Sequence, residues 1–171
     1  MAAAGIVPPE AARDIRERGA FDIARIEEIE QVTQHDVIAF TTAVAEKVGE
    51  SARWMHFGMT SSDVIDTAQA LQMREACDVI LRDLDGLAGA IRERAFEHKM
   101  TPMIGRTHGV HAEPMTLGLK LALWYAEVSR NIERVRQARV TVSVGKLSGA
   151  VGTFAHLPPS IEADVCAKLG L

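Results

Sequence analysis

The amino-acid sequence predicts an all-α fold, with a small N-terminal helical domain followed by the long helices of an incomplete bundle. Hydrophobic residues make up 47% of the chain but aromatic residues only 5%, so the core is mainly aliphatic, which suits packed helices better than sheets. Two long stretches also repeat apolar residues at alternating steps of three and four. This spacing is typical of helices in a bundle.

Three short helices are expected near the N-terminus. Prolines precede the first, and a glycine follows both the first and the third, as is usual at helix ends. Since the pattern changes near residues 53–58, we place an N-terminal helical domain at 1–55 and the start of a long-helix domain at 56–171. The expected short helices are Glu10–Arg18, Asp22–Val32 and Asp36–Val48.

Two much longer helices should follow, over about residues 62–98 and 114–142, the second beginning at Pro114. They would be about 55 Å and about 44 Å long at about 1.5 Å per residue, so neither can cover its apolar seam within a domain of this size. We expect both to pack against further long helices, in a longer chain or in other subunits. Glycines and prolines predict a loop over Ser143–Pro159, and Ser160 is the expected N-cap of a last helix.

Charge and cysteine usage argue against several classes of protein. The formal net charge is −4 and there is no basic run, so nucleic acid is not the expected main partner. No stretch reaches the roughly 18 uninterrupted apolar residues of a membrane span, and the first residues do not resemble a signal peptide. Cys77 and Cys166 lack metal-site spacing and are typical of reduced thiols. Together these features predict a cytoplasmic protein.

The densest group of chemically active residues is the segment Gly105–Pro114, between the two long helices. It combines His108 and His111 with arginine, threonine and glutamate. A histidine on such a turn titrates near neutral pH and can pass a proton to a leaving group. The alternative, which spacing alone favours, is a connecting loop whose polar groups cap the next helix. No metal is expected, because the helical H-E-x-x-H motif and a completing cysteine are both missing.

A second group, His56–Asp63, places three hydroxyl side chains and an acid just before a long helix. Thr60 or Ser62 could cap that helix by accepting hydrogen bonds from its first amides. The same amides and hydroxyls, at the positive end of a helix, can bind a carboxylate or phosphate. The two interpretations are compatible.

A third group, Gln34, His35 and Asp36, lies between the second and third short helices. On spacing alone these residues are expected only to cap a helix or to lie at the surface. His98 and His156 have no supporting neighbours and are interpreted as structural.

Taken together, these segments resemble the fumarase/aspartase superfamily of lyases. Residues 56–64 are similar to its first shared segment and residues 105–114 to its second. The segments 34–40 and 146–153 resemble bacterial-type adenylosuccinate lyases more than fumarases or argininosuccinate lyases. The resemblance covers nearly the whole chain, from about Gly5 onward, with all four segments in the family order.

The resemblance implies an all-α enzyme that forms a homotetramer, assembles each active site from three subunits and breaks a C–N bond by β-elimination. Its small-molecule substrates would be adenylosuccinate, which yields AMP and fumarate, and the related succinocarboxamide ribotide of purine synthesis. It implies no cofactor and no metal. His108 would be the general acid that protonates the departing nitrogen. The substrate-binding residues would be Gln34, His35, Asp36, His56, Thr60 and Ser61.

The resemblance also implies segments that are not found in this sequence. The family has an Arg-Tyr pair before the part similar to Gly5 and a serine-rich loop after the part similar to Leu171, and the serine of that loop is the expected base. We therefore expect a truncated chain that is inactive alone. Family members often have arginine at the position of Gln34, which alters one charged contact with the substrate.

Two other functions stay open at this point. One is a different lyase of the same superfamily with another amine leaving group, which competition by AMP would distinguish. The other is a non-catalytic helical module that associates through its long apolar seams. The lack of a base favours such a module, whereas the intact segment around His108 argues against it.

Overall fold

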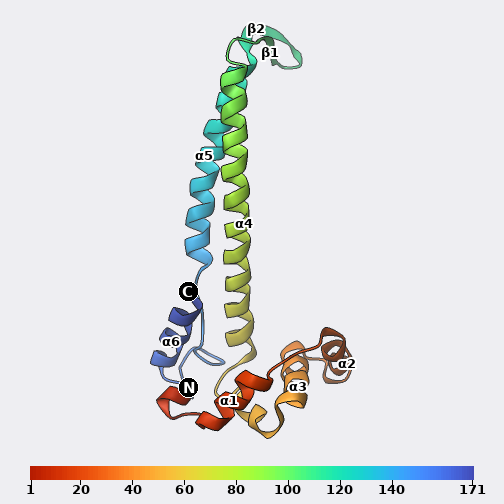
Figure 1. The fold of residues 1–171 in the computed structure, drawn as a ribbon, viewed down its shortest axis with the longest axis vertical. Coiled ribbons are helices and arrows are strands. Elements are labelled where there is room, and N and C mark those ends of the chain that lie inside the picture. The colour runs from red at the N-terminus through yellow and green to blue at the C-terminus, as the bar shows by residue number, and fades with distance from the viewer. The chain divides into compact units, whose positions relative to one another are not determined.

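The computed structural model describes every residue from Met1 to Leu171. It confirms the all-α class, with six α-helices, two short 3-10 helices and a single two-stranded sheet (Figure 1). The chain forms two compact units, one of residues 1–68 and 145–171 and the other of residues 69–144. The elements are η1 (Ala2–Ala4), α1 (Pro9–Arg18), α2 (Ile23–Thr33), α3 (Asp36–Val48), η2 (Gly49–Trp54), α4 (Ser61–Glu97), β1 (Pro102–Thr107), β2 (Val110–Thr116), α5 (Leu117–Val142) and α6 (Pro159–Leu169).

The three short helices lie where the sequence predicts them, because their ends are marked by local chemistry. Helix α1 ends where the backbone N–H of Gly19 donates to the carbonyl of Ile15. Helix α2 begins after Asp22, whose carboxylate accepts from the N–H of Arg25 at 2.9 Å. These are the usual ways to satisfy the free backbone groups at helix termini.

The first long helix, α4, also agrees with the prediction, but the expectation that a helix begins at Pro114 is wrong. Pro114 lies in β2 and pairs with Ile104 of β1 in an antiparallel hairpin. Helix α5 begins at Leu117, after Thr116, whose hydroxyl accepts from the N–H of Leu119 at 3.2 Å. Proline favours a first helical turn but is equally compatible with an edge strand, so it does not specify the helix start.

The hairpin turn consists of only two residues, His108 and Gly109. Both have positive φ, 48° and 76°, which is the conformation that matches the right-handed twist of the two strands. Gly105 breaks the strand register, and a Cβ at this position would lie 2.9 Å from the carbonyl oxygen of Glu113. The hairpin therefore depends on glycine at a close backbone approach as well as at its turn.

The last helix is α6, and the predicted N-cap at Ser160 is wrong. The residue before the helix is Pro158, and the helix begins at Pro159. The ring of Pro159 fixes a helical φ and needs no N–H partner at the first position, so the helix begins before Ser160. The preceding loop agrees with the prediction.

The first unit has two small hydrophobic cores. One joins α2 and α3 through Ile29, Ala39 and Ala43. The other joins α6, the loop before it and the N-terminal segment. Its buried members are Leu147, Leu157 and Ile161, and the half-buried Met1, Ile6, Met59 and Val165 pack against them. The second core holds the loop that reaches the beginning of α4.

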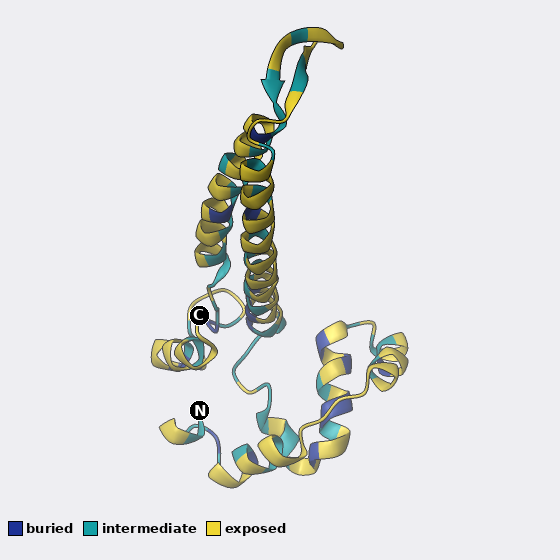
Figure 2. Cartoon of the chain, turned by 45° about the horizontal axis from the view of Figure 1, so that its top comes forward, coloured by how far each residue is buried: buried dark blue, intermediate teal, exposed yellow.

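Much of the second unit is exposed, as the yellow along α4 and α5 shows (Figure 2). Several of its large apolar side chains are among the exposed residues. Ala88 of α4 and Ile132 of α5 are buried. Within residues 1–171 the predicted apolar seams are only partly covered, because most of their residues are half-buried and the rest are mainly exposed. No helix combines the length and the apolar character that crossing a bilayer requires. The exposed side chains include Val79, Ile80, Leu87, Phe96, Leu119, Leu123, Trp124 and Val140.

Candidate functional site

The turn between α2 and α3 carries three of the residues predicted to bind substrate. Gln34 has φ of 51° and ends α2, with its N–H donating to the carbonyl of Glu30 at 2.8 Å. Its side-chain Nε2 donates to the carbonyl of Gln31 at 2.8 Å. The Gln34 amide is therefore engaged in satisfying the end of its own helix.

His35 caps the beginning of α3. Its Nδ1 lies 3.3 Å from the N–H of Ile38 and accepts a hydrogen bond from it. A neutral ring that accepts at Nδ1 must carry its proton on Nε2, so His35 has an N–H donor to offer elsewhere. Asp36 accepts from the N–H of Val37 at 2.7 Å. Both side chains are well exposed, at 40% and 65%.

His56 lies in the turn between η2 and α4. Its Nε2 is buried and makes no hydrogen bond. A buried polar atom without a partner costs about 1–3 kcal/mol, so this nitrogen would gain from a bond to a group outside residues 1–171. The turn is tightly held at Gly58, where φ is 73° and a Cβ would lie 2.9 Å from Leu157.

Thr60 and Ser61 stand at the beginning of α4. The backbone N–H of Thr60 donates to Oδ2 of Asp63 at 2.9 Å, and the N–H of Asp63 donates to the carbonyl of Thr60 at 3.0 Å. This is the acidic half of a capping box. Ser62, predicted as a possible N-cap, instead lies inside the first turn of α4. The hydroxyls of Thr60 and Ser61 make no hydrogen bond within the chain, so the predicted cap by the Thr60 side chain is not formed, and both residues are half-buried.

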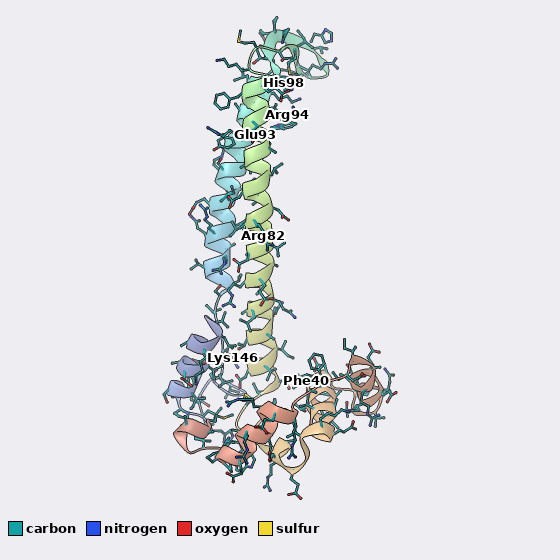
Figure 3. The ribbon with its side chains drawn as sticks, in the orientation of Figure 1. Phe40, Arg82, Glu93, Arg94, His98 and Lys146 are labelled. Carbon is teal, nitrogen blue, oxygen red and sulfur yellow. The ribbon has the colours of Figure 1, made fainter.

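Asp63, which sequence reasoning did not select, is the centre of the polar contacts in the first unit. Its side chain is fully buried, with 0% exposed. Its carboxylate accepts from Nζ of Lys146 at 2.6 Å and from the N–H groups of Ser148 and Gly149, each at 3.1 Å, besides that of Thr60. Lys146 is labelled in Figure 3. The one sequence signal was the spacing of Thr60 and Asp63, which fits the capping-box pattern.

These contacts determine the protonation state of Asp63. Burial acts to raise its pKa, but hydrogen bonds from the Lys146 ammonium and from the Thr60 and Ser148 amides outweigh burial. The pKa of Asp63 therefore lies below its ordinary value of 3.8. At neutral pH the pair is a buried carboxylate neutralised by a half-buried ammonium.

Hydrogen bonds hold the main chain of Lys146 as well as its ammonium. Thr67 of α4 donates its hydroxyl hydrogen to the carbonyl of Lys146 at 2.9 Å and accepts from the N–H of Lys146 at 3.0 Å. The next N–H, of Leu147, donates to the carboxylate of Glu162 in α6 at 2.8 Å. The loop is thereby fixed to both helices.

His108, the predicted general acid, lies in the second unit, at the hairpin turn. Its side chain is exposed, as are those of His111 and Glu113. All the predicted substrate-binding residues lie in the first unit, on two turns: one carries Gln34 to Asp36 and the other carries His56 to Ser61. No group of three or more histidine, cysteine, aspartate or glutamate side chains is placed to hold a metal ion.

Residues 3–171 match the model of a family described as lyase. The chain is 54% identical over 167 residues to adenylosuccinate lyase from Bacillus subtilis and 56% identical over 167 residues to that from Streptococcus mutans. Both matches cover 98% of this chain and 39% of the relative.

Two solved structures are also similar. Fumarate lyase from Mesorhizobium sp. BNC1 is 32% identical, with a TM-score of 0.87 over 99% of this chain and 40% of its own. The 3-carboxy-cis,cis-muconate lactonizing enzyme from Pseudomonas putida is 32% identical, with a TM-score of 0.89 over 98% and 40%. The chain thus spans about two fifths of the length of these proteins.

Proposed function

Since this chain belongs to the lyase family, we propose that it is part of a cytoplasmic enzyme of purine biosynthesis that releases fumarate from adenylosuccinate by β-elimination, leaving AMP. The same site would act on the succinocarboxamide ribotide. The observation that carries the proposal is the identity of 54% and 56% to two adenylosuccinate lyases over 98% of this chain. Within the proposed enzyme, residues 1–55 would belong to the N-terminal domain and residues 56–171 to the central one.

The chemistry of the substrate supports this assignment. Adenylosuccinate carries two carboxylates and a phosphate, and the beginning of a helix attracts anions through its free N–H groups and its dipole. The start of α4 offers such a helix end, with the hydroxyls of Thr60 and Ser61 beside it. We propose that these residues bind a carboxylate or the phosphate, and that the buried Nε2 of His56 gains a partner in the bound state.

We assign the proton transfer at the leaving nitrogen to His108. Elimination requires a base to remove the proton next to a carboxylate and an acid to protonate the departing nitrogen. His108 would be the acid. His35 would donate from Nε2 to the substrate, with Asp36 and Gln34 beside it on the same turn. The loop whose serine is the family's expected base is not found in residues 1–171, so we propose that this stretch alone does not convert substrate. We also propose that the complete enzyme is a homotetramer.

The test is a chimera, in which the matching segment of the Bacillus subtilis enzyme is replaced by this chain. We expect the chimera to release fumarate within about tenfold of the parent rate, because the exchanged segments share 54% of their residues. Release of fumarate is followed by absorbance, and assembly by sedimentation. A chimera that folds and assembles like the parent but releases no fumarate would contradict the proposal.

One observation favours a second candidate, a non-catalytic association module: the exposed apolar side chains of α4 and α5. If the chain were such a module, it would associate with itself or with other helices. The chimera would then show no activity. A different lyase of the same family would be active on another amine and would not be inhibited by AMP. Competition by AMP in the chimera therefore separates the two enzymatic candidates.

A further inference from the structure

We propose that Lys146 is a positioning residue: through Asp63, it prepares the beginning of α4 to bind an anionic group of the substrate. This rests on the proposed function, because it presumes that Thr60 and Ser61 contact substrate. Lys146 itself lies in the loop between α5 and α6, and its ammonium is 2.6 Å from Oδ1 of Asp63.

The charge of Asp63 lies where an external anion would bind. A carboxylate in the first turn of a helix interacts with the same positive end that would attract an external anion. Asp63 occupies that turn and is buried, so its charge is poorly screened by solvent. The ammonium of Lys146 neutralises it. Without Lys146, a substrate carboxylate or phosphate approaching Thr60 and Ser61 would meet an uncompensated negative charge.

Asp63 also links Lys146 to the backbone of Thr60. The Asp63 carboxylate that Lys146 holds also accepts from the N–H of Thr60 at 2.9 Å. The position of Thr60 therefore depends on the position of the Asp63 side chain. Thr67 holds the main chain of Lys146 through two hydrogen bonds of 2.9 and 3.0 Å. The Lys146 side chain therefore extends to Asp63 from a fixed backbone position.

Loss of the Lys146 ammonium would leave the other hydrogen bonds to Asp63 in place. Three backbone N–H groups, those of Thr60, Ser148 and Gly149, would still bond the Asp63 carboxylate if the ammonium were removed. Lys146 also donates to the carbonyl of Gly149 at 3.2 Å, and losing this longer hydrogen bond should cost less than losing the contact with Asp63. We therefore expect a variant without the ammonium to fold, with an uncompensated charge in the first turn of α4 and with Thr60 held less firmly.

The test uses the chimera with Lys146→Met and Lys146→Arg, and Lys168→Met as the matched control. Lys168 forms an ion pair of the same length, 2.6 Å, with Asp164 on the exposed face of α6. We expect Lys146→Met to raise KM for adenylosuccinate about tenfold and to change kcat by less than about threefold, because the added repulsion acts on binding. Lys146→Arg should restore KM, and Lys168→Met should leave both constants unchanged.

A second measurement asks whether Lys146 acts through Thr60. In a Thr60→Val background, the effect of Lys146→Met on KM should shrink, since the two changes share one binding contact. If Thr60→Val raises KM but Lys146→Met does not, the inference is overturned and the proposed function stands. If Thr60→Val leaves KM unchanged, the assignment of Thr60 fails, and this inference falls with it.

The remaining outcomes are equally decisive. A Lys146→Met variant that melts at a lower temperature but keeps the parent KM would show that Lys146 only stabilises the fold. Should Lys146→Met give no folded protein, Lys146→Gln takes its place, because it keeps a donor for the carbonyl of Gly149 but no charge. The same rise in KM is then expected, and its absence overturns the inference.

Discussion

Arg25 of α2 and Glu46 of α3 form an ion pair in which the guanidinium contacts both carboxylate oxygens, with Nη2–Oε1 at 2.7 Å and Nε–Oε2 at 3.1 Å. Arg25 also bonds Glu28 within its own helix at 2.8 Å. The pair ties α2 to α3 beside their small core, and so holds the turn that carries His35. The hydrogen bond from Arg25 keeps the pKa of Glu46 below its ordinary value of 4.5.

We predict that Glu46→Gln lowers the melting temperature of the chimera slightly at neutral pH, because exposed ion pairs contribute little. Since the pKa of Glu46 is depressed in the folded state, its stabilisation is present above pH 4.5 and is lost as pH falls through the folded value. The difference in melting temperature between the parent and Glu46→Gln should therefore shrink as the pH is lowered through this range. Glu27→Gln on α2 is the control and should show no such change.

Asp63→Asn should destabilise the chimera far more than Asp164→Asn. The amide cannot accept from Lys146, Thr60, Ser148 and Gly149 together, and it places an NH₂ among donors. Breaking a buried pair costs about 3–5 kcal/mol, and the partial exposure of Lys146 lowers the expectation to about 2–4 kcal/mol. Urea unfolding measures this difference, with Asp164 as the exposed counterpart on α6. Equal losses at the two positions would contradict the central role of Asp63.

The same depressed pKa predicts how the stabilisation by Asp63 depends on pH. Its contribution is complete above the ordinary value of 3.8 and is lost as pH falls through the lower folded value. The stability difference between the parent and Asp63→Asn should consequently narrow only in strong acid. A difference that already disappears near neutral pH would mean that Asp63 is not charged in the folded protein.

His108→Asn should lower kcat of the chimera by about 10²–10⁴-fold while changing KM little, because only the proton transfer is lost. Asparagine is chosen because it tolerates the positive φ of this turn, so the hairpin is kept. The control is His98→Asn, in the turn after α4, where Nδ1 lies 3.2 Å from the hydroxyl of Thr101. Comparable losses at both positions would remove the assignment of His108 as the acid.

A pair of glycine substitutions tests how α4 and α5 approach each other. A Cβ at Gly118 would lie 2.5 Å from the carbonyl oxygen of Ala95 and 2.5 Å from Cα of Lys99, whereas a Cβ at Gly86 meets nothing within 4 Å. Gly118→Ala should lower the melting temperature by forcing the helices apart. Gly86→Ala should raise it, since alanine is favoured over glycine inside a helix by about 0.5–1 kcal/mol. A rise in both variants would contradict the close approach at Gly118.

The sequence predicts most helices well, because helix ends are local events. Asp22 caps α2, and Gly19 and Gly49 follow α1 and α3. The β1–β2 hairpin was missed because Pro114 was interpreted as a helix start, although the two-residue turn at His108 lies within the segment that had been selected for its chemistry.

The candidate site was predictable only where its residues are neighbours in sequence. The resemblance to the lyase superfamily assigns Thr60 and Ser61 to substrate binding through one short shared segment, which also precedes a long helix. The contact between Asp63 and Lys146 joins residues 83 positions apart, and no periodicity or capping rule indicates which loop will reach a given helix end. The lysine and the aspartate are each ordinary in their own segments, so their relationship appears only in three dimensions.

The exposed apolar faces of α4 and α5 have a consequence for how stability is measured. Removing those side chains from water requires a surface that residues 1–171 do not supply. When a partner supplies that surface, the free energy of unfolding of these helices includes a free energy of association. If the covering surface belongs to another subunit, as in the proposed homotetramer, dilution weakens these helices without altering a single bond within the chain, and the melting temperature rises with protein concentration.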